Sequence, residues 1–325
     1  MILKLMIAAS AGAMALASAA AAPAQIGSVD WTIRPTGRTP GDDLVHLSLS
    51  YRTGSNGHNM NSRAVPLRDL QGLSRAQLAS REGAPTRFRM VREAGTLDCE
   101  GLVRQERGTG ECRFDADAAY AAALERRGIG RPTMQQQYQM AVQNVGLGLI
   151  DELDRQGYRR PGMNSLMAAA IHGVSIPYVR SLADAGYRLG SVDDLVKFRI
   201  HGVDAEFIRA MSGLRGTRFT ADQLVSMRIH GVSPAKVREF ADLGYRNLTH
   251  DQLLQMSIHG VSPSYVRELA AAGYRDLKPS QLVAMRIHGV TPAFAREFHD
   301  RGFERPSAEQ LVAMRIHGVR PGRRR

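Results

Sequence analysis

Cysteine is scarce in this chain, with two residues among 325. A metal site needs more ligands than such a pair supplies. Long apolar runs are scarce too, because no segment after residue 22 approaches the roughly 20 apolar residues that cross a bilayer. We therefore expect neither a metal centre nor a transmembrane segment in the mature chain.

Catalytic signatures are also missing. The sequence contains no His-Glu-x-x-His, no Gly-x-Ser-x-Gly and no phosphate-binding loop of the usual spacing. We expect a non-enzymatic protein that uses no cofactor.

The first residues are typical of an export signal. Met1–Lys4 carries one positive charge, Leu5–Leu16 is apolar and rich in alanine, and small residues follow as far as Ala22. Signal peptidase recognises this pattern. Residues 1–22 are therefore predicted to be a signal peptide, and the mature protein is predicted to be periplasmic or secreted.

The two cysteines, Cys99 and Cys112, lie on two runs with the character of paired strands. A hairpin centred on Gln105 and Glu106 sets them opposite each other, within reach of a disulfide. An oxidising compartment favours that bond. Two reduced cysteines in the core are the alternative.

Residues 28–117 predict a small antiparallel β-domain. In Val45–Tyr51 apolar residues alternate with polar ones, as a strand with one wet face requires. Five or six short strands are expected, with a short helix over 73–80. Residues 118–157 then predict two bridging helices, over 118–127 and 133–153.

A sequence repeat occupies residues 158–325. Its marker is the tripeptide His-Gly-Val, which recurs six times at an unbroken interval of 29 residues. The histidines are His172, His201, His230, His259, His288 and His317. The glycines are Gly173, Gly202, Gly231, Gly260, Gly289 and Gly318.

Residues 220–245 represent one copy. Thr220 and Gln223 form a capping-box pattern that begins a first helix, and we expect Leu224, Met227 and Ile229 to form its apolar stripe.

Gly231 ends that helix in a left-handed conformation, and Val232 is expected to contact Met227. Ser233 and Pro234 then begin a second helix. Helices of about ten residues are not stable alone, so the copies are expected to stack. The predicted fold is α+β: the β-domain, then an α-solenoid of five full helix-turn-helix repeats, a terminal half repeat and a basic tail.

The histidines have three interpretations. Equivalent atoms of stacked repeats lie on the order of 10 Å apart, too far to share one metal ion. Each histidine is instead expected to cap its helix and donate to free carbonyls. A pH-responsive role is the remaining alternative.

Arginine recurs at the same interval in two rows. The candidate partner-binding row is Arg180, Arg209, Arg238, Arg267 and Arg296. A second row, before the histidines, is Arg199, Arg228, Arg286 and Arg315. Ion pairs with Asp184, Asp242 and Asp300 one turn away explain the first row structurally, and the favourable charge at a helix C-terminus explains the second. A guanidinium ladder for phosphate or carboxylate is the functional alternative.

The net charge is +12, and in residues 158–325 Lys and Arg outnumber Asp and Glu by ten. This excess favours anionic partners. A high-GC genome gives the same composition without any function.

The repeat Leu-Val-x-Met-Arg-Ile-His-Gly-Val-Ser/Thr-Pro resembles the helical repeats that follow the membrane zinc-peptidase domain in β-lactam-sensor-like (antirepressor metallopeptidase) bacterial proteins. Residues 31–35 and 127–133 resemble segments next to those repeats. The peptidase motif is absent here, so the resemblance implies an extracytoplasmic repeat region without proteolytic activity.

Residues 229–245 show a weaker similarity to helix-hairpin-helix DNA-binding units, although Ser233, Ser262 and Thr291 stand where those hairpins usually have glycine. Together these observations predict an exported protein-interaction module, with another envelope protein as partner and a role in envelope signalling or sensing. A periplasmic binder of DNA or another polyanion, acting through the arginine rows, is the alternative, and a pH-responsive sensor is a third.

Overall fold

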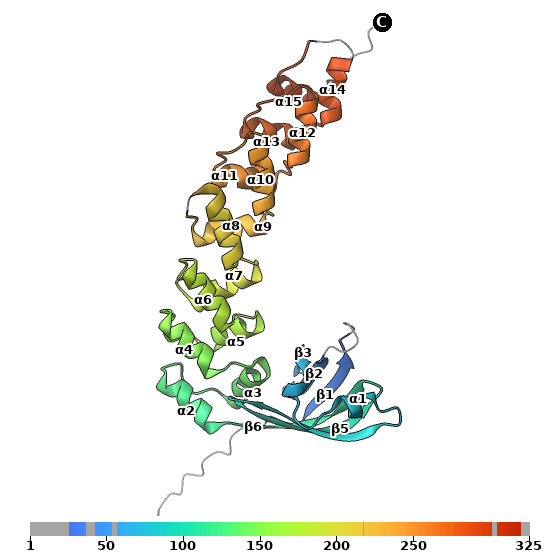
Figure 1. Ribbon diagram of the computed structural model, residues 1–325, viewed down its shortest axis with the longest axis vertical. Helices are drawn as coiled ribbons and strands as arrows, with labels where there is room; N and C mark the ends of the chain where they lie inside the picture. The colour runs from blue at the N-terminus through green and yellow to red at the C-terminus, as the bar shows by residue number, and fades with distance from the viewer. Residues whose placement is uncertain (1–25, 37–42, 54–56, 217, 301–303, 320–325) are drawn as a thin grey trace, which may run out of the picture. The chain divides into compact units, whose positions relative to one another are not determined.

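The structure, a computed structural model, is α+β: a six-stranded antiparallel sheet followed by a series of short helices (Figure 1). It describes residues 26–36, 43–53, 57–216, 218–300 and 304–319. The predicted signal peptide, 1–22, and the basic tail, 320–325, lie outside these residues.

Contacts divide the chain into two units. Among the described residues, those in 26–91, 97–116 and 133–135 belong to the β-unit, and those in 92–96, 117–132 and 136–319 belong to the helical unit. Each unit is described separately below.

The sheet of the β-unit has the strand order β3-β2-β1-β6-β5-β4. Its strands are β1 (Val29–Pro35), β2 (Leu44–Thr53), β3 (Gly57–Pro66), β4 (Ala84–Arg92), β5 (Gly95–Arg104) and β6 (Arg107–Ala116). On β2, the alternation seen in the sequence buries Val45, Leu47, Leu49 and Tyr51. The expected strand character of this segment is confirmed, because one face of the strand packs into the core and the other is wet.

Two short helical elements follow β3: η1 (Leu67–Asp69) and α1 (Arg75–Ala79). Ser74 and Gln77 form a capping box at the start of α1, within the short helix expected over 73–80. The carbonyls of Leu78 and Ser80, at the end of α1, accept hydrogen bonds from the backbone amides of Glu106 and Gln105 in the β5–β6 turn. This turn therefore fixes α1 against the β-unit.

The β5–β6 hairpin turns at Gln105 and Glu106, both with positive φ, as expected from the sequence. The hairpin sets Cys99 opposite Cys112, and the two form a disulfide with a Cα–Cα distance of 4.0 Å. The alternative of two reduced cysteines is thereby excluded.

Trp31 is fully buried and determines where the sheet needs glycine. Its indole N–H donates to the Glu100 carbonyl at 3.1 Å, and its ring meets Phe88 edge to face at 5.0 Å. A Cβ on Gly110 would lie 2.7 Å from the indole nitrogen and 2.0 Å from the Glu100 oxygen. Only glycine at this position leaves room for the ring.

We predict that Gly110→Ala destabilises the β-unit by about 2–4 kcal/mol, because the added methyl group overlaps backbone and indole atoms that cannot move aside. Gly27→Ala is the control, because a Cβ there meets nothing within 4 Å. Chemical denaturation followed by Trp31 fluorescence measures both. Equal midpoints for the two variants would contradict this packing account.

The helical unit consists of short helices whose neighbours alternate along the chain. The helices are α2 (Ala118–Arg126), α3 (Met134–Gln143), α4 (Leu147–Arg155), α5 (Met163–Ile171), α6 (Ile176–Asp184), α7 (Val192–Ile200), α8 (Ala205–Arg215), α9 (Ala221–Ile229), α10 (Pro234–Asp242), α11 (His250–Ile258), α12 (Pro263–Ala271), α13 (Pro279–Ile287), α14 (Pro292–Asp300) and α15 (Ala308–Ile316). From α4 onward, the most extensive contacts join helices that are two apart in the chain: α4 with α6, α6 with α8, α8 with α10, α10 with α12 and α12 with α14 among the even-numbered helices, and α5 with α7, α9 with α11, α11 with α13 and α13 with α15 among the odd-numbered ones. The helices thus pack in two rows (Figure 1).

Local sequence rules explain the helix starts. Side chains of Ser, Thr or Asp cap the first turn in most cases, as Thr220 does by accepting from the Gln223 amide at 3.2 Å. Proline follows the cap in α10, where its missing N–H costs nothing. Gly216 ends α8, which is longer than its neighbours. The helices α6, α10 and α12 are instead followed by the dipeptide Gly-Tyr, which is absent after α8.

The single helix expected over 133–153 is wrong, because the chain forms α3 and α4 there. Asn144 adopts φ 57° between them, and the Val145 amide donates to the Met140 carbonyl at 2.9 Å. Asparagine tolerates the left-handed conformation that ends a helix in this way. The apolar residues on both sides of Asn144 gave a continuous helical pattern that concealed this break.

Candidate functional site

The six His-Gly-Val turns share one geometry. Each histidine is the C-cap of its helix, each glycine has φ between 66° and 73°, and each valine amide donates to the carbonyl five positions earlier at 2.8 Å. These are the bonds of a Schellman motif. Five of the valines are buried, whereas Val319, in the last turn described, is 47% exposed.

The structure places the six histidine side chains at the surface, exposed or half-buried. Within the described residues none of their rings forms a hydrogen bond or an ion pair. Each histidine caps its helix through its backbone amide, which donates to the carbonyl four positions earlier. The carbonyls of two turn glycines, Gly202 and Gly260, instead accept hydrogen bonds from arginines of the next odd-numbered helix.

The isoleucine before each histidine is exposed, which corrects the expectation that Ile229 belongs to the apolar stripe. The exposed fractions are 59% for Ile171, 54% for Ile200, 54% for Ile229, 45% for Ile258, 54% for Ile287 and 57% for Ile316. Leu224 and Met227 are fully buried and keep the places expected of them in the core. In so short a helix, periodicity could not tell Ile229 from an inward position.

The second arginine row links consecutive helix pairs. In each case the guanidinium lies 4.3–5.1 Å from the centre of an aromatic ring on the preceding even-numbered helix: Arg199 over Tyr178, Arg228 over Phe207, Arg286 over Tyr265 and Arg315 over Phe294. Arg228 also donates to the Gly202 carbonyl at 2.6 Å, and Arg286 donates to the Gly260 carbonyl at 2.8 Å. We call each such contact an arginine bracket.

Two of the ring partners extend the bracket. The hydroxyls of Tyr178 and Tyr265 donate to the Val203 and Val290 carbonyls, each at 2.7 Å. Burial raises the pKa of Tyr265 to about 12, so this phenol remains a donor at physiological pH. The row therefore acts structurally, and the signal that could have revealed it is the constant sequence spacing between each aromatic residue and its arginine.

The interface between α10 and α11 departs from this pattern on both sides at once. Lys236 occupies the aromatic position on α10, and Ser257 occupies the matching arginine position on α11. Lys236 Nζ donates to Ser257 Oγ at 2.6 Å, and burial lowers the pKa of Lys236. An arginine opposite this lysine would place two cations together, which explains the paired change.

We predict that Lys236→Tyr and Ser257→Arg are strongly coupled. Ser257→Arg alone destabilises the helical unit by repulsion from Lys236, whereas both changes together install a bracket worth about 0.5–2 kcal/mol. A double-mutant cycle of unfolding free energies measures the coupling. Additive effects would show that the brackets contribute no interaction between helix pairs.

The candidate partner-binding row of arginines is partly engaged within the helical unit. Arg180 pairs with Glu152 at 2.7 Å, and Arg267 pairs with Glu239 at 2.8 Å. Both acids lie on the preceding even-numbered helix, so the ion pair expected between Arg180 and Asp184, one turn away, is wrong. Sequence reasoning within one helix could not see a partner on the neighbouring pair.

Arg209 and Arg238 are exposed and form no ion pair in the described part of the chain. Arg296 is exposed as well, but the side chain of Asp300 one turn away lies outside the described residues. These residues, rather than the whole row, remain open to a partner.

Glu152 is the centre of the best-formed polar cluster in the helical unit. Its carboxylate, 3% exposed, accepts from Arg180 at 2.7 Å, from Arg155 at 2.7 Å and from Gln156 at 2.9 Å. The Arg180 hydrogen bond, followed by that of Gln156, lowers the pKa of Glu152 to about 2. Because the donors come from α4 and α6, the cluster ties one pair to the next.

This depressed pKa predicts an acid-labile contribution to stability. The carboxylate stabilises the fold fully above its ordinary pKa of 4.5, and that contribution is lost as the pH falls toward about 2. Glu152→Gln should therefore flatten the decline in unfolding free energy between pH 4.5 and 2, whereas Glu206→Gln, an exposed control, should not. Parallel declines in all three proteins would contradict the ion-pair account.

A groove of about 620 Å³ lies between α11 and α13. Its apolar wall is formed by Pro279, Val283, Ala284 and Ile287, and Gln252 and Gln255 face them from α11. The exposed Ile287 of the turn therefore forms one end of a concave apolar surface between the two helices.

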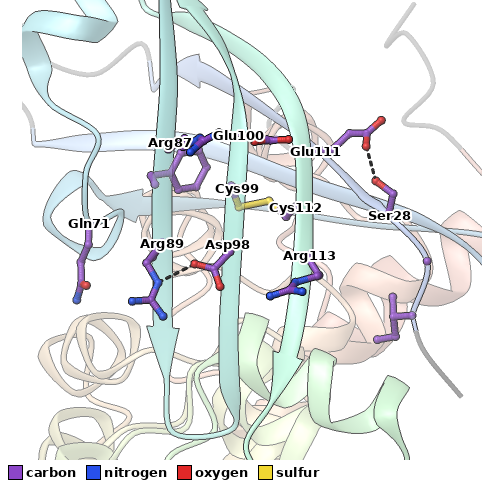
Figure 2. Close-up of a pocket in the computed structure, with 13 residues that line it drawn as sticks. Ser28, Gln71, Arg87, Arg89, Asp98, Cys99, Glu100, Glu111, Cys112 and Arg113 are labelled. Atoms are coloured by element: carbon purple, nitrogen blue, oxygen red, sulfur yellow. Dashed lines mark hydrogen bonds and ion pairs between the residues drawn. A yellow bond between two sulfur atoms is a disulfide. The ribbon is translucent and has the colours of Figure 1, made fainter. Parts of the chain in front are cut away.

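The β-unit has a depression of about 810 Å³ over β4, β5 and β6, next to the disulfide (Figure 2). Charged side chains of both signs line it, and two ion pairs form among them: Arg89 pairs with Asp98 at 2.7 Å, and Arg87 lies 3.5 Å from Glu100. The carboxylate of Glu111 accepts a hydrogen bond from the Ser28 hydroxyl at 2.9 Å. This arrangement is typical of a solvated sheet face.

Among the described residues, no group of three or more His, Cys, Asp or Glu side chains is placed to hold a metal ion. In the same part of the chain, no helix has the length and apolar character needed to cross a bilayer.

Comparisons with known proteins give no identification: no family model, no curated protein and no solved structure matches this chain.

Proposed function

We propose that the chain is an exported, non-enzymatic protein-interaction module in which α2–α15 form an α-solenoid of 29-residue helix-turn-helix repeats. Two features support the solenoid: the two rows of helix contacts and the arginine brackets at equivalent positions of successive copies. Solenoids bury a shared core and leave long surfaces for partners.

The proposed repeat begins earlier than the His-Gly-Val signature. Asn144 lies one repeat interval before Gly173, and both residues adopt the left-handed conformation. Tyr120, on α2, donates to the Val145 carbonyl at 2.8 Å, with the same sequence separation as from Tyr178 to Val203. The segment expected to consist of bridging helices is then the first part of the solenoid.

The observation that carries a binding role is the row of six exposed isoleucines at equivalent turns. Single exposed apolar residues are common and need no explanation. Six at one repeated position, beside fully buried leucine and methionine, indicate a surface kept apolar for contact. Packing leaves about half of each isoleucine uncovered. Contact with a partner is the simplest reason to keep isoleucine at this position in every copy.

Three observations support export and an envelope role: the signal-like N-terminus, the Cys99–Cys112 disulfide and the resemblance to extracytoplasmic repeats of antirepressor metallopeptidase proteins. We propose another envelope protein as the partner, in signalling or sensing. A periplasmic polyanion binder is the alternative, supported by the net charge and by the unpaired state of Arg209 and Arg238 in the described residues. Steep loss of binding with salt is its signature.

We predict that the mature chain, used as bait in an envelope extract of its source organism, retains one partner that the triple variant Ile200→Ser/Ile229→Ser/Ile258→Ser loses. The matched control is Met60→Ser/Leu102→Ser, which removes two side chains of the β-unit that are 68% and 51% exposed. Quantitative mass spectrometry compares the baits. Equal retention by all three baits would contradict a binding role for the turns.

A further inference from the structure

We propose that the turns bind an acidic amphipathic helix of a partner protein, an inference that rests on the proposed interaction function. The surface concerned is the turn edge, defined as the six Ile-His-Gly turns with the arginine that precedes four of them. Its isoleucines are exposed in every copy.

The charge of the turn edge selects an acidic partner. Four arginines belong to it, namely Arg199, Arg228, Arg286 and Arg315. Just after the turns, Lys236 adds a further cation, whereas Asp204 and Glu206 contribute two carboxylates. The surface is therefore apolar with an excess of positive charge. A second copy of this chain presents the same charge and is repelled, so self-association through this edge is disfavoured.

The spacing of the isoleucines selects a helical partner. Successive helix pairs are separated by one packing distance, about 8–10 Å. A helix rises about 10.5 Å over seven residues and returns to nearly the same face. A strand covers the same distance in about three residues, which places successive side chains on opposite faces. Only the helix can present one apolar residue to every turn.

The state of the arginines argues against a phosphate surface. Each of the four lies over an aromatic ring, and Arg228 and Arg286 also donate to turn carbonyls. The four arginines therefore contribute a positive electrostatic potential rather than free hydrogen-bond donors. The isoleucine side chains, in contrast, are exposed. The groove between α11 and α13, which Ile287 lines, adds a concave seat for an apolar side chain.

The test uses the mature full-length chain and designed helical peptides of about four heptads, with leucine along one face and glutamate beside it. A peptide with lysine in place of glutamate tests charge, and a scrambled peptide of the same composition tests the apolar face. Anionic phosphatidylglycerol vesicles and duplex DNA provide the non-protein probes. Fluorescence anisotropy, or co-sedimentation for vesicles, measures binding, and circular dichroism verifies the fold of each variant.

We expect the glutamate peptide to bind and the lysine and scrambled peptides to bind at least about tenfold more weakly. Ile229→Ser/Ile258→Ser should weaken the glutamate peptide by about tenfold or more, from the apolar area lost at two contacts, and Met60→Ser/Leu102→Ser should not.

Equal affinity for glutamate and lysine peptides would overturn the acidic assignment. Isoleucine-dependent binding of vesicles or DNA without peptide binding would assign the turn edge to a lipid surface or a nucleic acid instead. If the captured envelope partner still depends on the isoleucines while no acidic peptide binds, the interaction function stands and the acidic helix falls. If the isoleucine changes affect neither experiment, both proposals fall.

Discussion

The instability of a lone short helix is the constraint on which the helical unit depends. Forming the first turn of a helix costs more than so few hydrogen bonds return. Each helix pair therefore relies on its neighbours, through buried residues such as Leu224 and Met227, through the arginine brackets and through the Glu152 cluster. The β-unit is stabilised differently, by Trp31 packed over glycines and by one disulfide across a hairpin.

These requirements divide the residues of each turn by task. Glycine and valine terminate the helix and close the core, and arginine reaches back to the preceding pair. The side chains of isoleucine and histidine terminate no helix and form no hydrogen bond or ion pair in the described structure, yet both residues recur in all six copies. An exposed side chain that recurs at the same position of every copy can form part of a binding surface. At Lys236 and Ser257, by contrast, the two sides of one interface differ together from the equivalent residues of the neighbouring copies.

Local rules made much of the fold predictable from sequence. Strand alternation, the paired cysteines, the caps and the glycine-valine endings each involve residues that are close along the chain or directly cross-strand. What failed depended on distant neighbours. Ile229 was predicted to be buried because the sequence of one helix does not reveal which of its sides the neighbouring helices cover. The ion pairs of Arg180 and Arg267 with acids on the preceding even-numbered helix were likewise invisible to rules within one helix. The helix end at Asn144 was missed for a local reason, because asparagine is a weaker signal of a left-handed helix end than glycine.

The central claim is that neighbouring pairs, rather than individual helices, hold the helical unit together. Native-state hydrogen exchange of the valine amides in the six turns tests it most directly. All six amides make the same 2.8 Å bond to a helix carbonyl, so their local geometry is equal. The account predicts slow exchange at Val203 and Val232, flanked by pairs on both sides, and much faster exchange at Val319. Equal exchange at Val232 and Val319 would mean that each turn is stable by itself and would contradict the account.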